Sequence, residues 1–169
     1  MDRAVLWLAR GGGLGLLPKA PGTWGSLGGI VWAALLLVPG NLWFFIAGTL
    51  LGAGVSIWIC GRAERILDQT DPGEIVIDEI IALPICYLGL LIPLHLNDTS
   101  IALADLAPNA ATWYWVALGF AFFRLFDIWK PSPIGQLQNL PGGWGVTMDD
   151  LLAAIYTAAT LQLIWQLLS

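Results

Sequence analysis

Charged side chains are scarce in this 169-residue chain, and their scarcity excludes several classes of protein. Only 11% of the residues are charged, whereas 57% are hydrophobic. Soluble domains carry about 25% charged residues, so a water-soluble fold of this size is not expected. The net charge of −5 also argues against a nucleic-acid partner, because nucleic-acid binding requires a basic surface.

Cysteine and histidine are nearly absent, and the few present offer little chemistry. Cys60 and Cys86 lie in or beside apolar stretches without the spacing of a metal site, so both are interpreted as inert packing residues. His95, the lone histidine, is interpreted as an interfacial residue at the outer end of an apolar stretch. Arg10 interrupts the first short apolar run, which therefore does not resemble a cleavable signal. With no charged or serine-rich linker, residues 1–169 are expected to form a single domain.

Long apolar stretches dominate the rest of the chain. They cover residues 25–38, 42–60, 80–96, 112–128 and 151–168. The last four are 17 to 19 residues long, which nearly matches a hydrocarbon core of about 30 Å in helical form. The first has only 14 residues, so the sequence does not decide whether it spans. No alternating strand pattern occurs, and the ten Trp suit a membrane interface. The predicted class is an all-α integral membrane bundle of about five helices, with motif loops at the interface.

The basic residues predict the orientation of this bundle. All seven precede the first stretch, follow the second, or end the fourth, whereas the connections 39–41 and 97–111 have none. The positive-inside rule then places the N-terminus and residues 61–79 and 129–150 in the cytoplasm. Under this topology four polar clusters share the cytoplasmic face: PGTWGS (21–26), IVIDE (75–79), RLFDIWKP (124–131) and GGWGVTMDD (142–150). Charge beside a bilayer is costly and usually functional, so we expect a metal and phosphate site there.

The third cluster places one acid between two bases. Arg124, Asp127 and Lys130 are spaced by three residues, which puts them within an arc of roughly 120° on a helix. Arg124 suits a bidentate grip on phosphate, and Lys130 supplies a point charge. The alternative is an interfacial salt bridge that anchors the helix.

Two acidic pairs open the third and fifth stretches. Asp78 with Glu79, and Asp149 with Asp150, have no base beside them in sequence. Capping of a helix N-terminus explains one acid in each pair but not both. Four carboxylates on one face resemble the oxygen ligands of Mg²⁺, which takes a few carboxylates plus water and substrate phosphate.

The first cluster is the weakest signal. Thr23, Ser26 and two glycines lead into an apolar helix, where backbone N–H groups and hydroxyls can cradle a phosphate. Lys19 adds a positive charge nearby. An ordinary Pro-Gly helix entry is the alternative interpretation.

Several known phosphatase designs lack their required residues here. No Cys-x5-Arg loop, Asp-x-Asp pair or Asp-Gly-x2-Ala-Arg signature occurs, and His95 is placed on the outer side, away from the clusters. The remaining candidate is a phosphatase mechanism that uses acidic residues and a metal ion.

The four clusters, taken with LPKA (17–20) and with the Pro-Ser-Pro-Ile that continues the third, resemble the phosphatidylglycerophosphatase A family. The blocks span most of the chain in the family's order, and Ala82 is one departure, where the family pattern has glycine. The resemblance implies Mg²⁺-dependent removal of the terminal phosphate from phosphatidylglycerophosphate, a phospholipid substrate, at the cytoplasmic face of the inner membrane.

On this hypothesis each candidate residue has an expected role. Asp78, Glu79, Asp149 and Asp150 are the expected metal ligands, and Arg124, Lys130, Lys19, Thr23 and Ser26 the phosphate ligands. Asp127, Asp149 and Asp150 are the candidate catalytic acids, acting on an attacking water or as an aspartyl nucleophile. The alternative function is a small transporter or channel subunit in which the acids form an ion path. The sequence does not predict an oligomeric state.

Overall fold

The computed structural model describes residues 2–96 and 113–168, and all regular elements within these residues are helical. In chain order they are α1 (Asp2–Ala9), the short 3-10 helix η1 (Gly11–Leu16), α2 (Pro21–Leu37), α3 (Leu42–Leu67), α4 (Ile77–Leu96), α6 (Trp113–Trp129), α7 (Ile134–Leu137) and α8 (Gly143–Leu168). Five of the described helices have at least 17 residues, and the predicted all-α class is confirmed.

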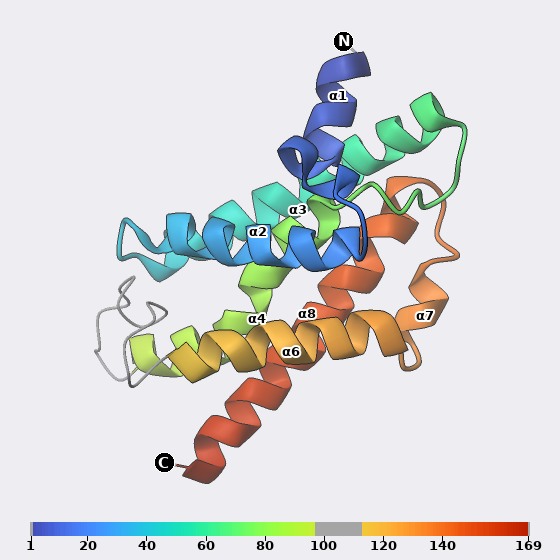
Figure 1. Ribbon diagram of the computed structural model, residues 1–169. Coiled ribbons are helices and arrows are strands. Elements are labelled where there is room, and N and C mark those ends of the chain that lie inside the picture. Colours follow the sequence, from blue (N-terminus) through green and yellow to red (C-terminus); the bar gives the residue numbers. More distant parts are fainter. Residues whose placement is uncertain (1, 97–112, 169) are drawn as a thin grey trace.

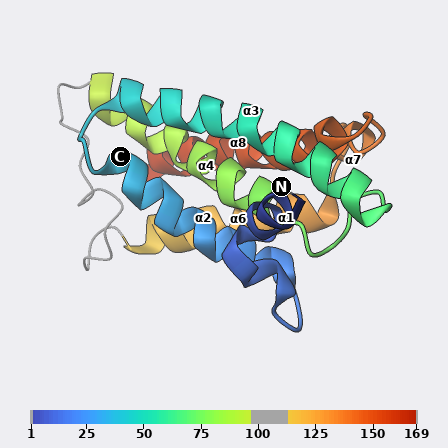
Figure 2. The same cartoon turned by 90° about the horizontal axis from the view of Figure 1, so that it is seen from above.

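The long helices run alongside one another, with α4 in the middle. Successive helices from α2 to α6 alternate in direction, and α8 crosses them obliquely in Figure 1. The view from above in Figure 2 shows the same lengthwise alignment. α4 packs against α2, α3, α6 and α8.

Apolar side chains from all the long helices fill the core around α4. Tyr87 of α4, Phe45 of α3, Phe123 of α6 and Leu161 of α8 are fully buried there. The Tyr87 hydroxyl donates to the backbone oxygen of Val116 at 3.4 Å, so its polar end is not left unpaired. This packing fixes the position of the polar first turn of α4 along the bundle.

Among the described residues, three helices are long and apolar enough to cross a bilayer: α3, α4 and α8. Helices of 26, 20 and 26 residues are about 39, 30 and 39 Å long, against a hydrocarbon core of about 30 Å. Large apolar side chains such as Trp43 and Leu51 of α3 point outward, as expected of a surface that faces lipid. α2 is also apolar but shorter, at 17 residues.

The helices begin earlier than the apolar stretches do, and this corrects the expected motif loops. α2 begins at Pro21, α4 at Ile77 and α8 at Gly143, so three of the polar clusters lie largely within the first two turns of these helices. Proline is favoured at the first helical position, and carboxylates are stabilised near a helix N-terminus, so the polar residues extend the helices. Pro84 and Pro93 do not divide α4.

Before α2 the chain forms a small unit that the sequence did not predict. α1 packs against α3, where Val5 and Ala9 join a second apolar cluster with Ile59 and Cys60. The expected outward connection at 97–111, and the expected start of the fourth stretch at Thr112, lie outside the described residues.

Candidate active site

The four polar clusters meet at one end of the bundle. The first turns of α2, α4 and α8 and the last turn of α6 lie toward the right of Figure 1, while the opposite helix ends lie toward the left. Ion pairs and close contacts join α4 to α6, α6 to α8 and α2 to α4 at this end. The helix directions therefore agree with the predicted topology.

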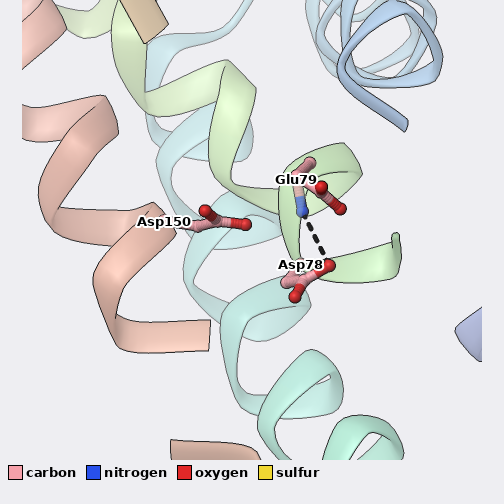
Figure 3. Close-up of side chains that lie close together, drawn as sticks. All are labelled: Asp78, Glu79 and Asp150. Atoms are coloured by element: carbon pink, nitrogen blue, oxygen red, sulfur yellow. Dashed lines mark hydrogen bonds between the residues drawn. The ribbon is translucent and has the colours of Figure 1, made fainter. Parts of the chain in front are cut away.

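Three carboxylates form the centre of the site. Asp78 and Glu79 belong to the first turn of α4, and Asp150 approaches them from α8 (Figure 3). One oxygen of each lies within 4.8 Å of the others. Asp78 and Asp150 are 5% and 4% exposed, so solvent screens their mutual repulsion weakly. A hard cation offsets such repulsion, and oxygen ligands at this separation fit one.

A row of alternating charges lies beside this group. Arg124 of α6 donates to Asp127 at 2.5 Å and lies 3.9 Å from Glu79. Lys130 lies 4.0 Å from the other oxygen of Asp127 and donates to Asp149 of α8. The predicted sandwich of Asp127 between two cations is therefore present. The two bases also neutralise acids on other helices, which the sequence did not predict.

Lys130 reaches its partners from outside the helix. It follows the last residue of α6 with a φ of 48°, which departs from the expected helical arc. Burial works to lower the pKa of Lys130, but the hydrogen bond to Asp149 and the neighbouring carboxylates raise it above its ordinary value. Lys130 is therefore a cation throughout the physiological pH range.

Three buried polar atoms in the site have no hydrogen-bond partner among the residues that the structure describes. They are Oε2 of Glu79, Nε of Arg124 and Oδ1 of Asp149. An unpaired buried polar group typically costs about 1–3 kcal/mol, so such groups mark strain or a binding site. The two oxygens are suited to a cation and the guanidinium nitrogen to an anion.

The first turn of α2 closes the site from the side of Glu79. A Cβ atom on Gly22 would lie 2.3 Å from Oε1 of Glu79 and 3.0 Å from Nη1 of Arg124. Only a residue without a side chain permits this approach. Thr23 is half-buried in the same turn, while Ser26 is buried and donates to the backbone oxygen of Gly22 at 2.8 Å.

Lys19 and Asp149 are placed differently from the central carboxylates. Lys19 is exposed between η1 and α2 and makes no ion pair with any described residue. Asp149 pairs with Lys130 instead of joining the group of Asp78, Glu79 and Asp150.

A buried pair of hydroxyl groups near the site was not predicted from the sequence. Ser56 of α3 and Thr147 of α8 lie 3.1 Å apart and are fully buried. The pair ties the start of α8 to α3 only two residues before Asp149. The one available signal was a hydroxyl inside the fourth cluster, which does not reveal a partner 91 residues away.

The cysteines and the histidine lie where the sequence predicted. Cys60 and Cys86 are buried free thiols within the packed helices. His95 is exposed in the last turn of α4, at the opposite end of that helix from Asp78.

Comparison with known proteins is consistent with these motifs. The family model described as Phosphatidylglycerophosphatase A matches residues 7–165. The Escherichia coli strain K12 protein named Phosphatidylglycerophosphatase A is 35% identical, covering 93% of this chain and 81% of its own length. The Haemophilus influenzae protein of the same name is 36% identical over 88% of this chain and 81% of its own.

A differently named relative is equally similar. A Bacteroides thetaiotaomicron protein named Putative phosphatidylinositol-3-phosphatase is 38% identical, covering 89% of this chain and 86% of its own length. No solved structure matches the chain. The family match and the first two relatives confirm the resemblance seen in the four clusters, and the chain belongs to the phosphatidylglycerophosphatase A family.

Proposed function

We propose that this membrane phosphatase hydrolyses the terminal phosphate monoester of phosphatidylglycerophosphate at the cytoplasmic leaflet, with Mg²⁺ as cofactor, to give phosphatidylglycerol. One observation supports the proposal above all others. A buried group of three carboxylates lies directly beside Arg124 and Lys130, at the end of an apolar helical bundle. Acids and bases so arranged are suited to a phosphate monoester and a cation together.

The residues present fit a divalent cation. Asp78, Glu79 and Asp150 would hold it, since their oxygens converge and Oε2 of Glu79 has no other partner. Asp149 has one unpaired oxygen, which would serve either as a further ligand of the cation or as the proton acceptor in the reaction, but not as both at once. Bound Mg²⁺ would supply positive charge that polarises a phosphoryl oxygen.

The bases would bind and orient the transferring phosphoryl group. Arg124 has a buried Nε without a partner, and its guanidinium lies between Glu79 and Asp127. Lys130 would add a cation from the α8 side. Donors fixed in place before the reaction stabilise the charge that develops in the transition state.

Hydrolysis then requires a water, a proton acceptor and a departing alkoxide. The water oxygen bonds to phosphorus while the bond from phosphorus to the glycerol oxygen breaks, and the departing oxygen takes up the proton that the acceptor has received from the water. Asp149, with one free oxygen, is better placed to accept the proton of the water than Asp127, whose two oxygens lie beside Arg124 and Lys130. The competing route forms an aspartyl phosphate on Asp149 or Asp127. Oxygen exchange from labelled water in single-turnover and multiple-turnover reactions separates the two routes.

The cytoplasmic orientation rests on the distribution of basic residues. Every described Arg and Lys belongs to the motif end of the bundle or to the α1–η1 unit beside it. The positive-inside rule assigns that end to the cytoplasm.

The distribution of charged side chains argues against the alternative function, a transporter or channel subunit with an ion path. An ion path would place charges near mid-membrane, whereas residues 80–94 of α4 and 151–168 of α8 contain no acidic or basic side chain.

The Bacteroides relative favours a phosphoinositide as the second candidate substrate. Both lipid substrates present a phosphate monoester on a polyol headgroup.

Phosphate release by the purified protein tests the proposal. Phosphatidylglycerophosphate and phosphatidylinositol 3-phosphate with matched acyl chains are compared in mixed micelles, with Mg²⁺ and with chelator. We expect turnover of the first lipid that is lost with chelator and restored by Mg²⁺. Preference for the inositol lipid would reassign the substrate, and turnover of neither would refute the phosphatase proposal.

A further inference from the structure

α1 lies across the bundle instead of along it. It runs crosswise to α2 and α6 in Figure 1, and Figure 2 shows it end-on while the long helices run lengthwise. If the long helices cross a bilayer, α1 lies roughly in the membrane plane, near the motif end. This is the orientation of an interfacial amphipathic helix.

The two faces of α1 have different surroundings. Val5 and Ala9 are buried against α3, whereas Trp7 and Leu8 are 61% and 42% exposed. η1 continues the exposed apolar surface with Leu16, which is 58% exposed. Trp is enriched at the headgroup level because its ring is amphipathic. The outer surface of this unit is therefore apolar enough to enter an interface.

The same segment is basic in a chain that is acidic overall. Residues 2–20 contain Arg3, Arg10 and Lys19 but only one acid, Asp2, while the whole chain has a net charge of −5. Arg10 pairs with Glu74 at 2.7 Å, and Asp2 lies 3.7 Å from Arg62. Arg3 and Lys19 are exposed and have no ion pair among the described residues.

A pocket of about 200 Å³ lies within this surface. Its lining residues are Arg3, Leu6, Trp7, Arg10, Gly13 and Leu16. Nε of Arg10 is buried and has no hydrogen-bond partner. Arg3 and the unpaired Nε of Arg10 line this pocket together with apolar side chains, a combination that complements the phosphate and the upper acyl chain of a lipid. The pocket contains none of the carboxylates of the active site.

We propose that α1 and η1 form a binding site for an anionic phospholipid of the bilayer, with Arg3 and Arg10 at its phosphate and Trp7 and Leu16 beside its acyl chains. Lys19 adds long-range attraction to the same anionic surface. The occupant is a phosphodiester lipid with a net negative charge. A zwitterionic lipid presents a compensating ammonium group and gains less from the arginines.

Native mass spectrometry of the full-length protein measures this selectivity directly. The protein in detergent is mixed with equal amounts of phosphatidylglycerol and phosphatidylcholine that have identical acyl chains. We expect the wild type to retain the anionic lipid preferentially. Arg3→Gln should lower that preference about fivefold, because it removes one of the two arginines that line the pocket, and Arg3→Gln with Lys19→Gln should lower it further. Arg65→Gln, which removes an exposed charge from α3, should leave it unchanged.

The depth of α1 provides a second and independent measurement. A nitroxide on Leu8→Cys should collide more with oxygen and less with a water-soluble nickel reagent than one on Gln69→Cys, an exposed position after α3. The native cysteines are buried, and the unmutated protein reports any labelling of them. Equal binding of the two lipids, an equal effect of Arg65→Gln and Arg3→Gln, or equal nickel accessibility at positions 8 and 69 would each overturn the proposal.

Discussion

Adding one methyl group at Gly22 should damage the active site without destabilising the fold. A Cβ atom there would lie 2.3 Å from Oε1 of Glu79, whereas ordinary van der Waals contact begins at 3.4 Å. Relief therefore requires a movement of about 1 Å, and the atom that moves is the end of a flexible carboxylate. The guanidinium of Arg124, at 3.0 and 3.3 Å, is crowded by the same methyl group.

The energetic consequence falls on catalysis and not on stability. A misplacement of about 1 Å in a catalytic constellation can cost about 100-fold, so we expect Gly22→Ala to lower kcat/KM about tenfold to a hundredfold. This corresponds to about 1.4–2.7 kcal/mol of transition-state stabilisation. Alanine is a better helix former than glycine, which offsets any small cost of moving the side chain.

Gly54 provides the matched control. It lies inside α3, and a Cβ atom there would meet nothing within 4 Å. Gly54→Ala should keep the full activity and raise stability by about 0.5–1 kcal/mol through helix propensity. The assay is phosphate release from phosphatidylglycerophosphate, with thermal unfolding followed by circular dichroism. Normal kcat/KM in a folded Gly22→Ala protein would show that the position of Glu79 does not limit the reaction.

Four further predictions address the individual groups. Arg124→Lys should lower kcat/KM about tenfold to a thousandfold, about 1.4–4 kcal/mol, because an ammonium cannot replace the guanidinium fork; near-normal kinetics would return this residue to an anchoring role. Asp78→Asn should leave less than about a tenth of the activity and weaken Mn²⁺ binding followed by electron paramagnetic resonance, and retention of both would refute its role as a ligand. His95→Ala should be silent, since the ring is exposed at the opposite end of α4, and a large loss in folded protein would contradict the site assignment. Single cysteines at Ser132 and Gln69, in a background without the native thiols, should react only with reagent admitted to the cytoplasm. Labelling of either cysteine from outside would contradict the predicted topology.

The positions of the long helices and the four polar clusters could be predicted from the sequence because both depend on local pattern. Uninterrupted apolar stretches indicate membrane helices wherever they occur in the chain. The four clusters identified the family, and all four lie at one end of the bundle. The helix starts were predicted too late, because polar first turns such as that of α4 were counted as loop.

Pairing between the clusters was decided only by the tertiary structure. Asp149 and Asp150 are adjacent in sequence, but neighbouring residues point about 100° apart on a helix. Asp150 therefore faces Asp78 and Glu79, whereas Asp149 faces Lys130. Which of the two acids meets the other carboxylates and which meets the base depends on the rotation of α8 against α4 and α6, and packing sets that rotation.

The close approach at Gly22 and the direction of α1 also could not be predicted from the sequence. Gly22 resembles an ordinary helix entry until α2 is packed against Glu79 and Arg124. The apolar run that contains Trp7 is too short to indicate a membrane span, and its direction across the bundle follows from its contact with α3. Composition and local pattern determined what kind of protein this is and which residues are candidates for the site. The orientation of one helix against another, set by long-range contacts, determined how those residues are combined.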